Sequence, residues 1–362
     1  MKPSRRTHGM RNFVMWGSLL GALPVASAQA AVPDLGTCPA IQNDAERLVC
    51  FDKLAGKLPP VPPVPTPAPV AVTKIQATPA TIAQSPAATV APALPPVSLL
   101  SRKWELDDAD KHGTFQFRPF RPTYLLPAKY SNSPNNAPFR GNLIQPTASL
   151  DPVEVKIQFS AKAKAVEGLL TPNLDVWLGY TVTSFWQAYN NGASAPFRET
   201  DYSPEAMLVY RTHYNVAGLT GRFINLGLAH ESNGRSVALS RSWNRIYAQF
   251  GFERGNFALM IRPWYRIPES ASQDNNPDIQ DYLGRGDIEA TYNHQGNTYS
   301  MLLRNNLKSK NNRGAVELNW SFPLQGRLKG YLQYFNGYGE SLIDYNHSQQ
   351  SLGIGFSLAD WM

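Results

Sequence analysis

The residues best suited to chemistry stand close together in one short stretch of the chain. His230 and Ser232 are separated by a single residue, and Asn244 follows a little further on. On a β-strand, two residues with this spacing project from the same face. An imidazole beside a hydroxyl can accept its proton, and a side-chain amide can hold that imidazole in one tautomer. These residue types therefore predict a serine nucleophile activated by a histidine base.

The strands expected to carry these residues predict that all three project from one side of a sheet. The pair His230 and Ser232 continues an apolar stripe formed by Ile224, Leu226 and Leu228. Asn244 opens the following strand, whose apolar register continues through Ile246, Ala248 and Phe250. A hairpin between the two strands would bring the amide close to the imidazole. Polar groups on an apolar face are costly unless they have a task; the alternative is an interface histidine beside a surface serine.

Alternating apolar and polar residues fill the chain from about residue 100 to its end. Clusters of Asn, Gly, Asp, Ser and Pro separate segments of about ten residues, a pattern typical of strands and turns. We count about twelve such segments, near residues 115–130, 151–165, 174–189, 206–214, 221–232, 244–254, 256–267, 279–294, 297–308, 313–324, 327–338 and 348–359.

The inward-facing positions of these strands carry charges of both signs: Arg245, Glu253, Arg262, Arg266, Glu317 and Lys329. A soluble β-sandwich, the alternative, would bury an apolar core there. After the amino-terminal run, no stretch is long and apolar enough for a transmembrane helix. We therefore predict an all-β fold over residues 98–362, a twelve-stranded antiparallel transmembrane β-barrel with a polar lumen that is packed rather than open.

Three segments precede the predicted barrel. Residues 1–30 combine a basic start, an apolar run and a small-x-small site, which predicts a signal peptide. Residues 31–57 form a small periplasmic module, where export to an oxidising compartment favours a disulfide between Cys38 and Cys50 over two free thiols. Residues 58–97 contain twelve prolines and one charge, Lys74, which indicates an extended linker or simple spacer.

The formal net charge of +7 overstates how basic the exported chain is. Four basic residues and no acid lie within the first twelve positions, inside the predicted signal peptide. The remaining chain is only mildly basic. Because nucleic-acid-binding proteins concentrate Lys and Arg on one face, the composition gives no indication of a nucleic-acid partner.

The run from His230 to Arg235, together with Ser240–Arg245, resembles the signature of the outer-membrane phospholipase A family. Further matches are Pro196–Thr200, Pro263–Tyr265, Asn276–Asp278 and Gly337–Tyr345. The resemblance spans roughly residues 100–362, so the cysteine module and the linker fall outside it.

The resemblance implies a twelve-stranded barrel with a Ser-His-Asn triad, dependence on calcium and activation by dimerisation. Position by position, Ser232 matches the nucleophile, His230 the base and Asn244 its orienting partner. Gly234 matches the residue whose backbone N–H helps to form the oxyanion hole.

The resemblance also implies a calcium site shared by the two subunits of a homodimer. Its matched ligands are the Ser240 hydroxyl, the Arg235 carbonyl and, from the partner subunit, the carbonyl of the residue equivalent to Ser194. Calcium prefers oxygen ligands, and none of these three is a carboxylate, so we expect a modest affinity. A site divided in this way would be complete only in the dimer.

The chain departs from the family pattern at several positions. Val237 and Asn275 stand where the family can have acids linked to a second calcium position, which argues against such a site here. Val182 stands where a glutamine can form a hydrogen bond across the dimer interface, so dimerisation is expected to be weaker or to rely on packing. Glu231 replaces a neutral amide beside the base and should point into the lumen.

The expected function is calcium-dependent hydrolysis of glycerophospholipid acyl esters, at sn-1 and sn-2 and in lysophospholipids, at the bacterial outer membrane. One alternative is a non-enzymatic pore or structural barrel that has kept the motif. Another is a different barrel hydrolase, such as a lipopolysaccharide deacylase or a protease.

Overall fold

The computed structural model describes residues 43, 47, 98–140 and 149–359 of the chain. Asn43 and Arg47 belong to a separate unit, Met1–Ala88, in which the Arg47 N–H donates a hydrogen bond to the Asn43 carbonyl. The other described residues belong to the unit Thr89–Met362. The predicted signal peptide, the Cys38–Cys50 disulfide and the Pro-rich linker lie outside the described residues.

The second unit is almost entirely β-structure. Its strands are β1 (Phe117–Pro119), β2 (Thr123–Ser131), β3 (Val153–Val166), β4 (Leu174–Trp186), β5 (Phe197–Val216), β6 (Leu219–Ser232), β7 (Ser242–Arg254), β8 (Phe257–Ile267), β9 (Gly286–His294), β10 (Asn297–Asn305), β11 (Gly314–Gln325), β12 (Leu328–Tyr338) and β13 (Ser348–Ala359). The helices are short: α2 (Leu99–Trp104), α3 (Gln280–Leu283) and the 3₁₀ turns η2 (Asp108–Asp110), η3 (Ala137–Phe139), η4 (Asn191–Ala193) and η5 (Val237–Leu239).

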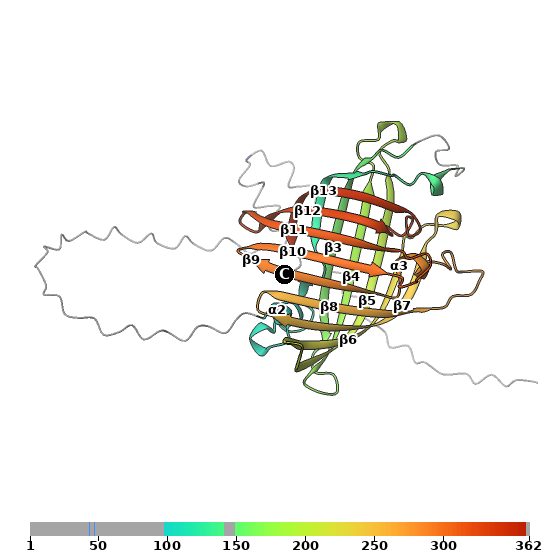
Figure 1. Ribbon diagram of the computed structural model, residues 1–362. Helices are drawn as coiled ribbons and strands as arrows, with labels where there is room; N and C mark the ends of the chain where they lie inside the picture. The colour runs from blue at the N-terminus through green and yellow to red at the C-terminus, as the bar shows by residue number, and fades with distance from the viewer. Residues whose placement is uncertain (1–42, 44–46, 48–97, 141–148, 360–362) are drawn as a thin grey trace, which may run out of the picture. The chain divides into compact units, whose positions relative to one another are not determined.

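The strands form one closed antiparallel barrel (Figure 1). From β2 onward each strand pairs with the next in sequence, and β13 returns to pair with β2. The short β1 pairs with residues 161–163 of β3, next to the residues of β3 that pair with β2. β1 and β2 therefore occupy one strand position of the wall. Thirteen strands thus make twelve wall positions, and the predicted twelve-stranded barrel is confirmed.

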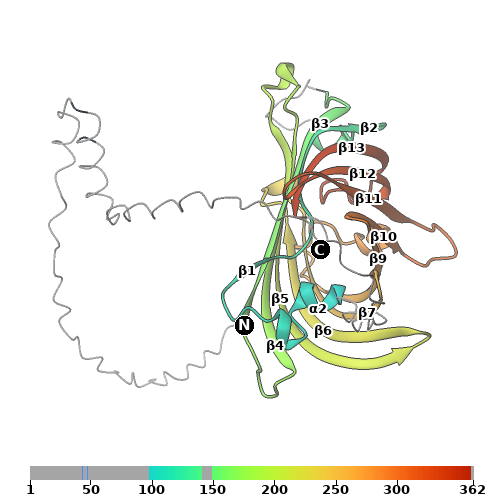
Figure 2. The same ribbon diagram turned by 90° about the vertical axis from the view of Figure 1, so that its left-hand side faces the viewer.

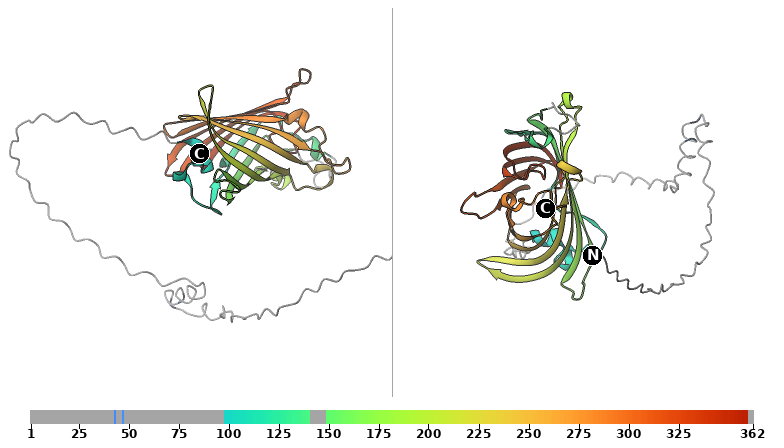
Figure 3. Two further views of the ribbon diagram at one scale, coloured as in Figure 1. Left: turned by 90° about the horizontal axis from the view of Figure 1, so that it is seen from below. Right: turned by 90° about the vertical axis from the view of Figure 1, so that its right-hand side faces the viewer.

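The two ends of the barrel differ in their connections. Two-residue hairpin turns at one end include Ala217-Gly218 and Gln295-Gly296, all with left-handed φ as such turns require. The opposite end carries the long connections, whose described residues are 132–140, 149–152, 187–196, 233–241, 268–285, 306–313 and 339–347 (Figures 1 and 3). In transmembrane barrels the short turns face the periplasm and the long loops face the cell exterior.

The outer wall is apolar, and the lumen is filled. Leu178, Leu228 and Ile354 are exposed on the outside. Inside, α2 lies within the ring of strands toward the turn end (Figure 2), where the Leu100 N–H donates a hydrogen bond to Glu253 at 2.9 Å. Trp104 of α2 packs against several buried rings, namely Phe120, Trp177 and Phe223. The lumen is therefore packed rather than open at this end, as predicted.

Across the described ranges, no helix is both long enough and apolar enough to cross a bilayer.

Three predicted strands have the wrong bounds. The single strand expected near residues 115–130 is two strands, β1 and β2, separated by residues 120–122. The strand expected from residue 279 begins only at Gly286, because Ile279 and Leu283 are buried with the helical spacing of i and i+4 around α3. The strand expected from residue 206 begins already at Phe197. Its first residues include charged side chains that point into the lumen, so the sequence shows no clear alternation of apolar and polar residues there.

Candidate active site

A row of polar side chains crosses neighbouring strands at the loop end of the outer wall. His230 in β6 lies opposite Asn244 in β7, and its Nδ1 is 2.8 Å from the Asn244 Oδ1. The imidazole is exposed on the same face as Leu226 and Leu228, whose side chains are 50% and 53% exposed. The histidine and the amide therefore meet on the lipid-facing side of the wall.

The second contact of Asn244 determines the proton position on the imidazole. Its Nδ2 donates a hydrogen bond to Glu269 Oε1 at 2.8 Å. An ionised carboxylate only accepts hydrogen bonds, so the amide nitrogen must face Glu269 and the amide oxygen must face the ring. Nδ1 of His230 then donates to Asn244, which leaves Nε2 as the basic nitrogen.

Ser232 is the last residue of β6 and pairs with Tyr202 of β5 and Ser242 of β7. Its Oγ accepts a hydrogen bond from the Gly234 N–H at 3.1 Å. Within the described residues this is the hydroxyl's one hydrogen bond, so the structure joins His230 to Asn244 but does not join it to Ser232. Contacts between base and nucleophile are often loose in unliganded enzymes.

Gly234 occupies a position that favours glycine. Its φ of +62° lies in the left-handed region, and a Cβ would lie 3.3 Å from the Tyr202 ring. The backbone can therefore turn sharply after Ser232 and direct the N–H of Gly234 back toward the hydroxyl.

The loop 233–241 is shaped by the buried side chain of Asn233. Its Oδ1 accepts hydrogen bonds from the backbone N–H groups of Arg235 and Arg241, at 3.3 and 2.9 Å. Its Nδ2 donates to the Leu239 carbonyl at 2.8 Å and to Glu199 Oε1 at 2.9 Å. One amide thus closes the loop on itself and ties it to β5.

The implied calcium ligands lie on two loops of the same end. Arg235 and Ser240 belong to the loop 233–241, and the Ser240 hydroxyl accepts a hydrogen bond from Asn275 Nδ2 at 2.9 Å. The Arg235 guanidinium is directed elsewhere, to Glu199 at 3.2 Å. Asn275 is thus a neutral hydrogen-bond donor at the position where the family can have an acid linked to a second calcium site.

Ser194 lies on the loop between β4 and β5 and is exposed. It and Ala195 have left-handed φ values of 60° and 46°, unusual for two consecutive residues with side chains. The Trp186 indole N–H fixes the loop by donating to the Ala195 carbonyl at 2.9 Å. Within the described chain, no hydrogen bond joins Ser194 to Arg235 or Ser240. No group of three His, Cys, Asp or Glu residues in the described ranges could hold a metal ion.

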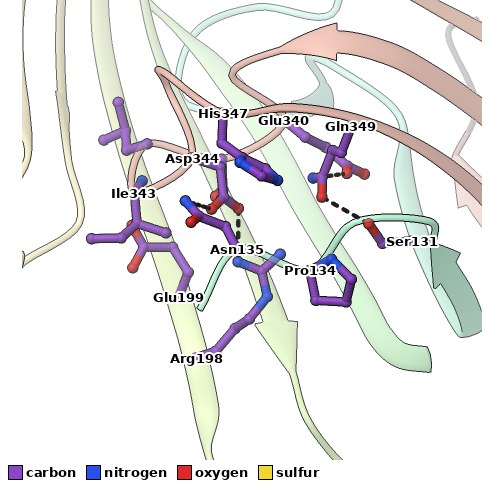
Figure 4. A network of polar contacts seen from close by, with 12 residues as sticks. Ser131, Pro134, Asn135, Arg198, Glu199, Glu340, Ile343, Asp344, His347 and Gln349 are labelled. Carbon is purple, nitrogen blue, oxygen red and sulfur yellow. Dashed lines mark hydrogen bonds and ion pairs between the residues drawn. The ribbon is translucent and has the colours of Figure 1, made fainter. Parts of the chain in front are cut away.

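A buried ion-pair network supports these loops from inside the barrel (Figure 4). The Arg198 guanidinium contacts Glu154 at 2.6 and 2.9 Å and Asp344 at 2.8 Å. Glu199, the next residue, accepts a hydrogen bond from the Ile343 N–H at 3.1 Å. The network therefore links the start of β5 to the loop 339–347.

A β-bulge explains why two consecutive residues of β5 both point inward. Phe185 pairs with Glu199 while Trp186 pairs with Phe197, so Arg198 is the extra residue. Without this irregularity the period of two would send either Arg198 or Glu199 toward lipid.

Glu340 in the loop 339–347 completes this network. It contacts Lys129 at 2.9 Å and Lys156 at 3.2 Å. Burial by itself would raise the pKa of the Glu340 carboxyl, but the two ammonium groups outweigh burial and lower it to about 2. The carboxylate is therefore charged at any pH the cell meets.

Two residues of the site, Glu269 and Asn233, were not predicted from the sequence. Glu269 continues the outward register of Tyr265 and Ile267, and Ile267 pairs with Asn244. That alternation was the available signal, but the strand ends at Ile267 and a loop begins. Asn233 stood inside the signature without a role assigned to it.

Residues 100–358 match the family model described as phospholipase A1. A protein of Neisseria meningitidis serogroup B, to which phospholipase A1 activity is assigned provisionally, is 39% identical over 94% of each chain. The phospholipase A1 of Escherichia coli K12 is 40% identical over 57% of this chain and 70% of its own.

Solved structures show the same architecture. The outer membrane phospholipase A of Escherichia coli superposes with a TM-score of 0.64 at 35% identity, over 68% of this chain and all of that one. The outer membrane phospholipase of Salmonella typhi, solved as a dimer with bound calcium, gives a TM-score of 0.64 at 34% identity over 70% of this chain and 95% of that one.

Proposed function

This chain belongs to the phospholipase A1 family, and we propose that it hydrolyses phospholipid acyl esters in the outer leaflet with Ser232 as nucleophile, His230 as base and Asn244 as orienting residue. It is an outer-membrane β-barrel hydrolase that acts on lipid esters. The observation that supports these roles is the 2.8 Å contact between His230 and Asn244 on the lipid-facing wall. Phospholipid substrate reaches the protein from that side.

The proposed reaction follows from the proton positions. Ser232 Oγ attacks the ester carbonyl while His230 Nε2 takes its proton. When the tetrahedral intermediate collapses, the ester C–O bond breaks and the imidazolium gives its proton to the leaving lysophospholipid oxygen. Water then attacks the acyl-enzyme with His230 as base, releasing the fatty acid. The Gly234 N–H lies beside the hydroxyl, where it could stabilise the oxyanion.

An apolar groove beside His230 and Asn244 supports acyl-chain binding. It has a volume of about 240 Å³ and lies on the same strands, lined chiefly by Val176, Ala206, Leu208, Leu226, Leu228 and Ile246. Leu228 precedes His230, and Ile246 follows Asn244, at alternating positions on the same face. An acyl chain lying along the outer wall would therefore lead to the nucleophile.

Calcium dependence is proposed from the donor chemistry of the loop 233–241. The Ser240 hydroxyl and the Arg235 carbonyl are oxygen donors of the type that calcium prefers. Ser240 retains a lone pair beyond the one that accepts the Asn275 hydrogen bond. A calcium ion held by these residues would supply positive charge near the developing oxyanion.

Activation through a homodimer is proposed because Ser194 is exposed on an outer loop of this chain that the Trp186 indole anchors. Its carbonyl would complete the calcium site of a second copy. Val182 and Tyr202 are paired across β4 and β5 on the outer wall, between this loop and Ser232. The interface would therefore rely on packing around these side chains.

A substrate panel tests the proposed function. The full chain in detergent micelles would be given diacyl phosphatidylethanolamine, lysophospholipid, lipopolysaccharide and a peptide, with calcium or with a chelator. We expect fatty-acid release from both phospholipids, reduced about 10²-fold in kcat by chelation and restored by calcium, because an oxyanion-stabilising charge is lost. Release from lipopolysaccharide or peptide alone would overturn the substrate assignment, as would ion conductance without any hydrolysis.

A further inference from the structure

Glu269 is a carboxylate in an unusual setting. It is half-buried, two residues beyond β8 on the outward register, and its Oε1 accepts the 2.8 Å hydrogen bond from Asn244 Nδ2. Among the described residues this is its one hydrogen-bond or ion-pair contact. Three carboxylates of the lumen differ, since Glu154, Glu231 and Asp344 each pair with an arginine. A charge at the lipid-facing side without a cationic partner is costly unless it has a task.

We propose that Glu269 is a fourth, positioning member of the catalytic row, acting on His230 through the amide of Asn244. This inference rests on the proposed function of Ser232 and His230. Three adjacent strands supply the relay: His230 from β6, Asn244 from β7 and Glu269 from the end of β8. Glu269 itself touches neither the ring nor the substrate.

The first effect of Glu269 is to select the orientation of the amide. An amide rotated by half a turn would present Nδ2 to the imidazole and force the proton onto Nε2. Nε2 could then no longer take the proton of Ser232, the same tautomer error that disables a Ser-His-Asp triad when its acid becomes an amide. Glu269 excludes that orientation because it can only accept a hydrogen bond.

The second effect is electrostatic. When the proton of Ser232 moves to Nε2, the ring becomes positively charged while Nδ1–H donates to Asn244 Oδ1. A carboxylate bonded to the amide nitrogen polarises the amide and makes its oxygen a better acceptor. Through this amide the Glu269 carboxylate stabilises the positive charge of the imidazolium, while the neutral Asn244 remains the group next to the ring.

Two substitutions of Glu269 separate these effects. We expect Glu269→Ala to lower kcat about 10-fold, the low end for a hydrogen bond to a charged group because the site is partly exposed. Glu269→Gln keeps an acceptor without the charge and should lose about 3-fold, less than a typical neutral hydrogen bond is worth. KM should stay within about 2-fold in both, since Glu269 lies outside the acyl groove. Ser270→Ala, an exposed change in the same loop, is the matched control and should have no effect.

A double substitution gives a readout that a merely structural role would not produce. In Asn244→Asp, two carboxylates would face each other where a hydrogen bond now spans 2.8 Å, and their repulsion should reduce kcat well below that of the wild type. Adding Glu269→Gln lets the new amide donate to the introduced carboxylate, rebuilding a Ser-His-Asp triad. We expect the double variant to be at least about 10-fold more active than Asn244→Asp alone.

The outcomes are distinguishable. Recovery of kcat in the double variant supports the relay. Additive losses in the double variant, or an unchanged kcat in Glu269→Ala, would overturn the relay but not the role of Ser232 as nucleophile. Absence of phospholipid hydrolysis by the wild type would instead refute the proposed function. Folding of each variant is checked by the mobility of the unheated barrel on electrophoresis. If Glu269→Ala does not fold, Glu269→Gln and the double variant decide between these outcomes.

Discussion

The proposed catalytic row of the outer wall (Ser232, His230, Asn244 and Glu269) and the inner ion-pair network lie on the same strand ends but are built from different groups. Along β6 and its loop, His230 and Ser232 belong to the outer row, while Glu231 and Asn233 turn inward. Glu231 contacts Arg245 at 2.6 Å and the Trp243 indole at 3.0 Å. His230 meets the neutral amide of Asn244. The alternation of β6 thus directs the ionic contact of Glu231 to the interior, while His230 on the lipid side meets a neutral amide.

Because the two groups of residues face opposite sides of the wall, stability and the proposed chemistry are separable in this protein. The charges of the inner network are paired because partners approach from strands and loops on several sides. A charge on the outer face has no such neighbours. Glu269, the one carboxylate of the proposed catalytic row, accordingly lies beyond the end of β8 and not within a strand. Changes to the inner network should therefore alter unfolding more than the catalytic constants.

The largest effect is expected for Arg198→Leu. Removing the guanidinium leaves Asp344 without its ion-pair partner and leaves Glu154 paired with Lys129. This loss should reduce the free energy of unfolding by about 3–5 kcal/mol. Denaturant unfolding in detergent or bilayers measures this, alongside kcat per folded molecule. A large loss of kcat at unchanged stability would break the proposed separation. Lys308→Met, which removes an exposed pair with Asp281, is the control and should cost no more than about 0.5 kcal/mol.

A smaller, pH-dependent effect is expected for Glu340→Gln. At neutral pH the variant should be less stable by about 2 kcal/mol, less than for Arg198 because Lys129 keeps its contact with Glu154. The carboxyl pKa is about 2 in the folded chain against an ordinary 4.5, so its contribution is fully present above pH 4.5 and disappears as the pH falls through 2. Unfolding at several pH values measures the difference between variant and wild type. A difference that grows on acidification would contradict this account.

The sequence predicts the part of the site that depends on strand periodicity. The outward register of Leu226, Leu228 and His230 follows from a period of two, and a hairpin then places Asn244 beside the imidazole. Strand number and the packed lumen follow from the same alternation and from inward charges. These features depend on local pattern alone.

Features that depend on tertiary contacts were not predictable in this way. The bulge at Arg198 is set by buried partners on β3 and on the loop 339–347. The break between β1 and β2 surrounds Phe120, which turns inward to pack on Trp104. Glu269 reaches Asn244 only because the loop after β8 keeps the outward direction of the strand for two more residues.

All the proposed roles depend on the Ser232 hydroxyl being the nucleophile on the lipid-facing wall. Reaction of the calcium-loaded full chain with an alkylsulfonyl fluoride, followed by mass-spectrometric mapping of the adduct, tests this assignment. We expect one adduct per chain, on Ser232, and none in Ser232→Ala. An adduct on another residue, or equal labelling of Ser232→Ala, would contradict it.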